Sequence, residues 1–437
     1  MAVRAVLVST YDLGHQSFGL ASPAAWLRRA GHEVRCADLS VGVFPERAVR
    51  DADGVAFYLP MHAATRMAAP VMTRVRDVNP LARLCAYGLY APLNADYLRS
   101  LGVETILGPE FEADLVRWLE GFPPQGGLPK LSFVTPDRTG LPAADRYAKL
   151  RVLGSERVTG YTEASRGCKH LCGHCPIVPV YQGAFRVVPV DVVLADIRQQ
   201  VEAGSEHITF GDPDFFNGPT HAMRIVEALH AEHPAVTYDA TIKVEHLRNH
   251  RDLLPRLRST GCLFVTTAVE SLDDAVLAKL SKGHTRADFI ETVADCRAVE
   301  LPLSPTFIAF HPWTTLESHR DLLRTLRDMS LIDNVAPIQL ALRLLLPQGS
   351  LLLNLPEIRD WVTGFDSKAL VHRWRHPDPE MEALGAQSFR TVSENPSATR
   401  REIFGRLCHL AFGRHYSEPV NLLPPAAIPY LTEPWYC

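Results

Sequence analysis

Apolar runs of strand length alternate with helix-like stretches over the first 121 residues. The strand-like runs lie at residues 4–10, 33–38, 54–58, 83–87 and 103–107, with helical patterns near 64–78, 94–100 and 110–119. A further helix is expected early in the chain, with Ser22 as its N-cap, Pro23 at its first position and Gly31 just past its end. Five strands spaced by helices predict a parallel doubly wound sheet, whose ligand crevice lies outside the carboxyl ends of the strands.

A second series of strand-then-helix patterns fills residues 159–346. The expected strands are 159–164, 207–211, 237–243, 263–270, 303–310 and 335–345, and the expected helices are 190–203, 221–232, 253–259, 273–280, 288–299 and 316–329. Six such units are two short of a closed eight-fold barrel. The pattern therefore predicts an α/β protein whose second part is an open, partial barrel with its active site at the carboxyl ends of the strands.

Breaks rich in proline and glycine divide the chain further. They make residues 122–158 a connector between the first unit, 1–121, and the barrel, 159–346. Residues 347–437 are less regular and form a C-terminal extension.

The composition is that of an ordinary soluble protein, with 46% hydrophobic and 22% charged residues among 437. The net charge of −4 gives no support for a general nucleic-acid binder. No apolar run approaches the ~20 residues that span a bilayer, and the start lacks the apolar segment of a signal peptide. Nine cysteines, three clustered and the others single, favour a reducing compartment. We expect a cytoplasmic protein without a membrane or nucleic-acid partner.

Three cysteines, Cys168, Cys172 and Cys175, follow the first strand of the barrel at C-x3-C-x2-C spacing. Three thiolates are one short of the four that close an ordinary iron–sulfur or zinc site. A cubane cluster held in this way keeps one iron open to a small molecule. The alternative is a zinc site with His170 or His174 as fourth ligand, although no second Cys/His pair follows at ribbon spacing.

The spacing of these cysteines resembles that of the radical S-adenosylmethionine (SAM) superfamily, whose core is an open partial barrel. The resemblance implies a 4Fe-4S cluster on the three cysteines, with SAM on the open iron through its amino and carboxylate groups. Reductive cleavage of SAM would then give methionine and a 5′-deoxyadenosyl radical. His174 holds the place of an aromatic residue whose backbone would face the adenine.

Three further strand ends carry candidates for contacts with SAM, and the resemblance assigns the residues at two of them. Gly211 and Asp212 occupy the place of a glycine-acidic motif that binds the ammonium of SAM, and a helix-capping loop is the alternative. Glu270 and Ser271 match a pair that reaches the ribose and methionine moiety, although Ser271 could also cap the next helix. Lys243 could meet the SAM carboxylate or a substrate anion, or lie in water.

The last two expected strands carry less specific candidates. His311 and Trp313 follow the fifth strand, where they would line the substrate or adenine side. Arg343, on the sixth, is a candidate for a carboxylate contact or for a structural ion pair.

The first 121 residues resemble the cobalamin-binding domain that precedes many radical SAM cores, through Gly19, Gly88 and Gly108 and the helices beside them. Such domains, where they ligate cobalt through histidine, carry D-x-H-x-x-G after the first strand. The loop 12–19 reads D-L-G-H-Q-S-F-G, with both spacings one residue too long. His15 therefore departs from the cobalt-ligand pattern, and a loop histidine bonded to backbone is the simpler interpretation. Some relatives without that histidine hold cobalamin and some have lost it, so the resemblance leaves cobalamin open.

The sequence stops on Cys437 after a proline-rich tail. In this tail, and around Cys168 and Gly211, it resembles the CUAEP/CCAEP-tail radical SAM proteins, which end near a Cys-Sec or Cys-Cys pair followed by Ala-Glu-Pro. We therefore expect a selenocysteine codon directly after Cys437. A thiolate or selenolate there could bind a soft substrate atom, quench a radical or donate hydrogen, and the alternative is an idle terminal cysteine.

The sequence thus predicts an enzyme that cleaves SAM reductively on a 4Fe-4S cluster, with a small-molecule substrate and a reductant such as flavodoxin or ferredoxin. Cobalamin would favour methyl transfer to an unactivated carbon or phosphorus. Its absence would favour hydrogen abstraction, or transfer of another SAM fragment to a soft acceptor. Two alternatives stay open: a non-catalytic zinc protein with a nucleotide-binding N-terminal domain, and an electron-transfer iron–sulfur protein whose spectrum does not respond to SAM.

Overall fold

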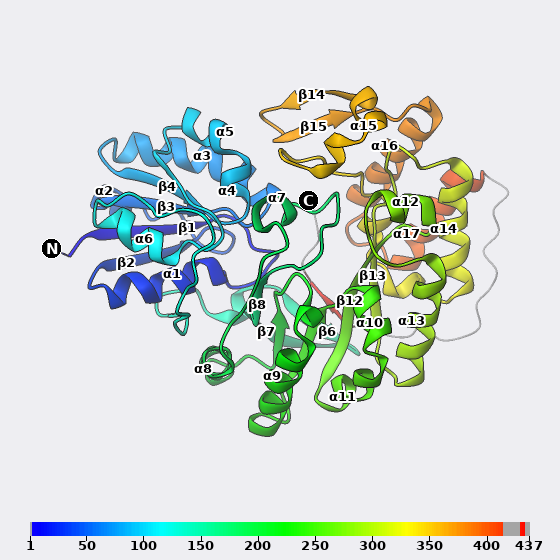
Figure 1. Ribbon diagram of the computed structural model, residues 1–437, viewed down its shortest axis with the longest axis horizontal. Coiled ribbons are helices and arrows are strands. Elements are labelled where there is room, and N and C mark those ends of the chain that lie inside the picture. Colours follow the sequence, from blue (N-terminus) through cyan, green and yellow to red (C-terminus); the bar gives the residue numbers. More distant parts are fainter. Residues whose placement is uncertain (1, 414–428, 433–437) are drawn as a thin grey trace.

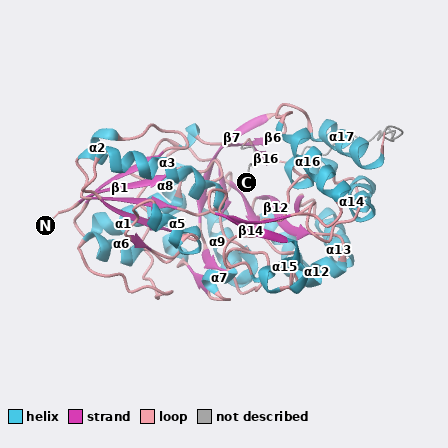
Figure 2. Cartoon of the chain, turned by 90° about the horizontal axis from the view of Figure 1, so that it is seen from above, coloured by secondary structure: helices cyan, strands magenta, loops and turns pink. Residues whose placement is uncertain are grey.

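The structure is a computed structural model that describes residues 2–413 and 429–432 (Figure 1). Two large sheets, each with helices against it, lie side by side along the long axis of the molecule (Figure 2). The predicted α/β class is confirmed. Cys437, the expected reactive tail residue, lies outside the described residues.

The first sheet is parallel and has the strand order β2-β1-β3-β4-β5. Its strands are β1 (Arg4–Ser9), β2 (Glu33–Asp38), β3 (Gly54–Tyr58), β4 (Arg83–Tyr87) and β5 (Thr105–Ile106). One face packs on α1 (Phe18–Arg29) and α6 (Glu112–Leu119), and the other on α2 (Glu46–Arg50), α3 (His62–Val78), α4 (Tyr90–Leu93) and α5 (Ala95–Ser100). From β1 the chain passes first to β2 on one side and then to β3 on the other, so the strand order reverses between β1 and β3. This switch point places the ligand crevice at the carboxyl ends of these two strands.

The first helix begins earlier than predicted, and the assignment of Ser22 and Pro23 to its start is wrong. Helix α1 starts directly after Ser17, and Pro23 lies inside it. A proline there cannot donate the hydrogen bond that the carbonyl of Gly19 would accept. The Tyr87 hydroxyl donates to this carbonyl instead, at 2.8 Å, so a contact with the sheet makes up for the missing amide.

The second sheet curls into a half-barrel of order β13-β12-β11-β10-β7-β6-β16 (Figure 1). Its parallel strands are β7 (Ser155–Thr162), β10 (His207–Phe210), β11 (Thr237–Thr241), β12 (Cys262–Glu270) and β13 (Leu303–Phe307). The helices that share its main core are α8 (Val190–Glu202), α9 (Pro219–Glu232), α10 (Val244–Asn249), α11 (Leu254–Ser259), α13 (Arg286–Ala298) and α14 (Leu316–Asp328).

Two parts of the barrel differ from the expectation. The sixth expected strand, 335–345, is instead a 3-10 turn that starts at Pro337, followed by a single bridge between Phe310 and Arg343. Pro337 has no N–H to give to a ladder, so the strand is reduced to that bridge. The expected connector, 122–158, contains β6 (Lys149–Val152), which pairs antiparallel with β7 and with β16 (Tyr430–Leu431).

The C-terminal extension covers one side of the half-barrel. It consists of α15 (Pro356–Trp361), the hairpin of β14 (Val362–Asp366) and β15 (Val371–Trp374), α16 (Pro379–Ser393) and α17 (Arg400–Phe412). Helices α16 and α17 bury their apolar side chains in the core of the barrel, and α15 packs with the hairpin on α12 (Asp274–Lys279). Every helix among the described residues is too short or too polar to serve as a membrane span.

Candidate functional site

The three cysteines lie in one loop at the carboxyl end of the half-barrel. The short strand β8 (Ser165–Gly167), paired with β9 (Phe185–Val187), leads from β7 into this loop. Gly167 has a φ of +73°, and a side chain there would collide with the Ala184 carbonyl and the ring of Tyr181. The turn into the cysteine loop therefore requires glycine.

The three thiols are free, with Cys172 buried and Cys168 and Cys175 partly exposed. Burial raises the pKa of the Cys168 thiol, and it raises the pKa of Cys175 to about 12. Thiolates in such surroundings form when a metal ion replaces their protons. The loop thus suits a metal centre better than a set of free nucleophilic thiolates.

The two histidines of the loop face other partners. Nε2 of His174 lies 3.2 Å from Oε1 of Glu270, and Nε2 of His170 lies 3.2 Å from Nε2 of His246. Neither contact involves a cysteine. Three thiols without a histidine between them fit a cluster with one open corner, whereas a closed zinc site needs a fourth ligand.

Glu270 ends β12 in a backbone conformation that is rare outside glycine. Its φ is +70°, and the register between β12 and β13 shifts at this point. Such a bulge re-aims a side chain at the end of a strand, and here the carboxylate faces His174 and, at 3.3 Å, Nζ of Lys282. Burial alone would raise the pKa of Glu270, but Lys282 and His174 outweigh burial and lower the pKa to about 2. The carboxylate is therefore charged throughout the neutral range.

Gly211 and Asp212 follow β10 at the same edge of the sheet. The amide of Ala164 donates to Oδ2 of Asp212 at 2.9 Å, and the Ser165 hydroxyl donates to Oδ1. Burial raises the pKa of Asp212 to about 7. The Asp212 carboxyl thus holds the strand that leads to the cysteines, and the ring of Tyr161 fills the space beside Gly211 where a side chain would lie.

The other candidates at the strand ends already have protein partners. Nζ of Lys243 lies 3.2 Å from Oε2 of Glu245. The hydroxyl of Ser271 accepts a hydrogen bond from the amide of Asp273, the N-cap of α12. Arg343 donates to Glu382 at 2.7 Å and lies over the ring of Trp374, an arrangement that matches the structural ion pair.

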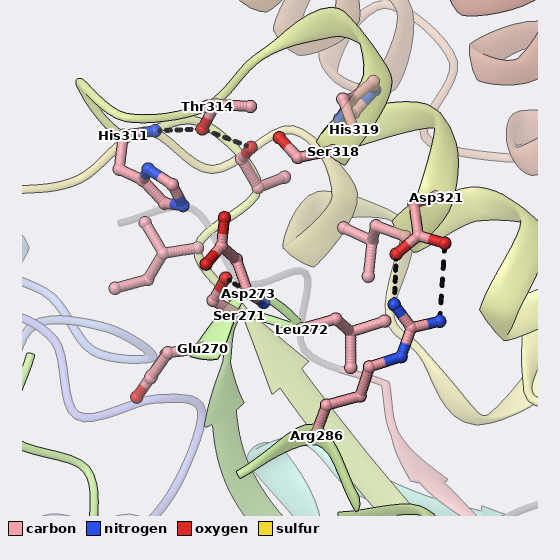
Figure 3. A pocket seen from close by; sticks show the side chains of 13 residues that line it. Glu270, Ser271, Leu272, Asp273, Arg286, His311, Thr314, Ser318, His319 and Asp321 are labelled. Atoms are coloured by element: carbon pink, nitrogen blue, oxygen red, sulfur yellow. Dashed lines mark hydrogen bonds and ion pairs between the residues drawn. The ribbon is translucent and has the colours of Figure 1, made fainter. Parts of the chain in front are cut away.

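A cavity of about 260 Å³ opens beside the end of β12 (Figure 3). His311 and Asp273 lie toward one side of it, and the ion pair of Arg286 with Asp321 lies on the other. Burial lowers the pKa of His311 to about 4. Most of the residues that line the cavity are polar, and one of them, Glu270, also contacts His174 of the cysteine loop.

Arg166, directly before Gly167, ties the cysteine loop to the first unit. Its guanidinium donates to the two oxygens of Glu112 at 3.0 and 2.6 Å and to Glu163 at 2.9 Å, with Glu110 3.6 Å away. Three aromatic rings surround it: Phe18, Phe111 and Phe133. This group was not predicted from the sequence, where the available signal was the pair Glu110 and Glu112 at the start of a helix beside the crevice.

The crevice of the first sheet holds buried polar atoms without partners. Within residues 2–413 and 429–432, Oγ of Ser9, Oδ2 of Asp12 and Nδ1 of His15 make no hydrogen bond. The ring of His15 packs on Tyr161 of the half-barrel, with 4.9 Å between centroids. Burial raises the pKa of Asp12 to about 8 and lowers the pKa of His15 to about 4. Neutral groups of this kind fit a hydrogen-bonding ligand between the two units.

The raised pKa of Asp12 predicts a pH-dependent stability. An unfolded aspartate loses its proton near pH 4, whereas folded Asp12 keeps it to about pH 8. Its contribution is therefore full at low pH and is lost as the pH rises through this window. Between about pH 5 and pH 8 the free energy of unfolding of the wild type should fall with rising pH. In Asp12→Asn this fall should be less steep, by up to ~1.4 kcal/mol per pH unit. Urea unfolding at several pH values measures this, and parallel profiles for both proteins would contradict it.

Comparison with known proteins identifies one domain of this chain. The family model of the radical SAM superfamily matches residues 162–326. This segment runs from the end of β7 into α14 and includes all three cysteines. Residues 162–326 therefore match a radical SAM domain, as expected. The narrower CUAEP/CCAEP-tail family is not shown by these comparisons.

Two relatives illustrate the range of chemistry. A tRNA-2-methylthio-N(6)-dimethylallyladenosine synthase from Chlorobium luteolum is 29% identical over 199 residues, which are 42% of this chain and 44% of that protein. The hopanoid C-3 methylase of Methylococcus capsulatus is 25% identical over 321 residues, 68% of this chain and 62% of that one. The chain spans about half the length of the first curated relatives that it matches.

Two solved structures share the fold over most of the chain. The first is the cobalamin-dependent SAM radical enzyme OxsB with aqua-cobalamin bound. The match spans 94% of this chain and 72% of the OxsB chain, with a TM-score of 0.72 and 13% identity. The second is the radical SAM methyltransferase TsrM from Kitasatospora setae. The match spans 81% of this chain and 76% of the TsrM chain, with a TM-score of 0.61 and 16% identity. At these identities the likeness concerns the fold, and it confirms a parallel-sheet unit followed by a half-barrel.

Proposed function

We propose that this protein cleaves SAM reductively on a 4Fe-4S cluster held by Cys168, Cys172 and Cys175. The observation that carries the proposal is the set of three free thiols in one loop, inside the segment that matches the superfamily, with His170 and His174 turned to other partners. When bound, the cluster supplies the electron for SAM cleavage, from a reductant such as flavodoxin or ferredoxin. The protein's own residues bind and aim the SAM.

Residues at three strand ends and in the cysteine loop are proposed to hold SAM. Glu270 is charged and lies against the cysteine loop, with Ser271 beside it, so the pair suits the polar ribose and methionine moiety. At Gly211 and Asp212 we assign the ammonium of SAM to carbonyl oxygens, because both Asp212 carboxyl oxygens already accept hydrogen bonds. The backbone at His174 would face the adenine. Lys243 is assigned to an anionic group, in exchange for its pairing with Glu245.

Glu270→Gln should weaken SAM binding roughly 10- to 100-fold, because hydrogen bonds to a charged group contribute ~1.5–3 kcal/mol. Equilibrium dialysis of SAM with the reconstituted protein measures the dissociation constant. Glu357→Gln is the matched control, because Glu357 is a glutamate that pairs with Lys279 outside the cysteine loop. Equal SAM affinity in the Glu270 variant and the control would remove Glu270 from the site.

We place cobalamin in the crevice at the ends of β1 and β3. The unpartnered atoms of Ser9, Asp12 and His15 support a ligand there, and the cobalamin-bound OxsB structure shares this fold. Loop 12–19 and Gly88 would hold the cofactor, which supplies a methyl carrier when bound. Methyl transfer to a small molecule is then favoured over hydrogen abstraction. The cavity beside Glu270 and His311 is the proposed place for part of the substrate or of SAM.

Product analysis separates these reactions. Protein produced with hydroxocobalamin, reconstituted under nitrogen and given SAM and a reductant, should show corrin absorbance and form both 5′-deoxyadenosine and S-adenosylhomocysteine. Formation of 5′-deoxyadenosine alone, without corrin absorbance, would keep radical SAM chemistry and reject methyl transfer. If neither 5′-deoxyadenosine nor S-adenosylhomocysteine forms, the proposed activity is overturned.

The division of the chain at residues 121, 158 and 346 is part of this proposal, with 122–158 lending β6 to the barrel sheet. The role of Cys437, the selenocysteine after it and the cytoplasmic location stay predictions.

A further inference from the structure

Beside the cysteine loop, three side chains from separate segments form a cluster that the proposed SAM chemistry does not use. His170 belongs to the cysteine loop, Asp214 follows β10, and His246 lies on α10. One nitrogen or oxygen atom of each lies within 4.8 Å of the others. All three segments are at the carboxyl edge of the half-barrel.

Asp214 is fully buried, with 0% of its surface exposed, and one of its oxygens has no hydrogen bond. Oδ1 accepts from the amide of Phe216 at 3.2 Å and faces the amide of Lys243 at 3.4 Å. Oδ2 lies 2.7 Å from Nδ1 of His246, yet within the described part of the chain neither atom makes a hydrogen bond. Two polar atoms this close, but not aligned as donor and acceptor, can both be satisfied by a cation that they share.

His170 completes the group. Its Nε2 lies 3.6 Å from Oδ2 of Asp214 and 3.2 Å from Nε2 of His246. Two neighbouring ligand atoms bound to one metal at about 2.1 Å lie roughly 3.0 to 3.4 Å apart. Nδ1 of His246 and Nε2 of His170, at 2.7 and 3.6 Å from Oδ2 of Asp214, lie on either side of this range. Rotation of the partly exposed imidazoles, whose Nε2 atoms are 3.2 Å apart, brings one nitrogen of each ring onto an ion shared with the carboxylate.

The charge balance also favours a cation. A buried carboxylate is costly unless a positive charge accompanies it. Among the described residues, the ion pairs of Asp214 are with His170 and His246 alone. Lys243, which could have neutralised it, pairs through Nζ with Glu245. Glu245 also lies 3.7 Å from Nδ1 of His170 and adds a second negative charge beside the group.

We propose that His170, Asp214 and His246 bind one divalent first-row transition metal ion, separate from the cluster. Two imidazoles and one carboxylate are the ligand set of catalytic zinc and mononuclear iron sites, and three protein ligands leave positions open for water or for an oxygen of the substrate. The ion joins the cysteine loop, the loop after β10 and α10. The site goes beyond the proposed SAM chemistry and does not depend on it.

The test uses the full chain with its cluster reconstituted, then titrated with Zn²⁺ and desalted. Elemental analysis should give about one zinc in addition to about four iron atoms per chain. Asp214→Asn and His246→Gln should each lose the zinc and keep the iron. His250→Gln is the matched control, because its ring lies 6.2 Å from that of His246 and packs on Phe216 instead. This control should keep both metals.

Co²⁺ in place of Zn²⁺ identifies the ligands. The proposal predicts weak visible d–d bands without the strong near-ultraviolet absorption of thiolate–cobalt bonds, and their loss in Asp214→Asn. Zinc retained in both folded variants, or cobalt bands with thiolate absorption, would overturn the site. Circular dichroism establishes whether each variant is folded. If His246→Gln is unfolded, the zinc content of Asp214→Asn alone decides whether the site exists.

Discussion

Replacing any one of Cys168, Cys172 and Cys175 by alanine should abolish formation of 5′-deoxyadenosine from SAM. Two thiolates cannot hold the cluster in a defined orientation with one iron open, so both the electron donor and the anchor for SAM are lost. Anaerobic incubation with SAM and dithionite, followed by chromatography of the products, measures the loss. Iron content should fall in parallel.

Cys296→Ala is the matched control for these variants. Cys296 is a buried cysteine on α13 of the same half-barrel, outside the cysteine loop. This variant should keep its iron and its SAM cleavage. Cleavage retained in the Cys172 variant, at the level of the control, would refute the role of the three cysteines.

Arg166→Met should lower the free energy of unfolding by roughly 3–5 kcal/mol, the usual cost of removing one partner from a buried charged group. The change leaves Glu110, Glu112 and Glu163 without the guanidinium that they share. Because Arg166 directly precedes the turn into the cysteine loop, cluster content after reconstitution should also fall. Chemical denaturation and iron analysis measure the two effects.

Arg198→Met is the control, because Arg198 pairs with Glu232 on the exposed surface. Exposed pairs contribute little to stability, so this variant should unfold like the wild type. Burial raises the pKa of Glu110 and of Glu163. The cost of Arg166→Met should therefore shrink toward pH 5, where these two unpaired carboxylates take up protons. Equal stability of the two variants would show that the buried group does not hold the units together.

The regular part of the fold follows from local patterns. The strands β1, β3 and β4 of the first sheet are short, mostly apolar runs buried on both faces, and such runs predict a parallel strand wherever helices cover both sides. The prediction fails where a long-range contact decides. Pro23 sits inside α1 because the Tyr87 hydroxyl bonds the carbonyl of Gly19, and Pro337 turns the expected sixth strand into a 3-10 turn.

The residues of the candidate site also fall into two groups, those that the sequence predicts and those that depend on long-range contacts. The cysteines are visible in the sequence because all three lie within eight residues, and Glu270 ends a strand whose pattern is clear. The partners of Arg166 and His170 are not visible in this way. Arg166 meets Glu112 across 54 positions, and His170 meets His246 across 76. The packing of the first unit on the half-barrel brings the first pair together, and the curl of the second sheet brings the second pair together.

The electron paramagnetic resonance spectrum of the reduced cluster, recorded before and after adding SAM, tests the central claim most directly. An iron with an open position that takes the amino and carboxylate groups of SAM should change the shape and position of the signal. We expect this change in the spectrum of the wild type and a smaller change in the spectrum of Glu270→Gln. A cluster whose signal is the same with and without SAM, or a protein that takes up no iron, would contradict it.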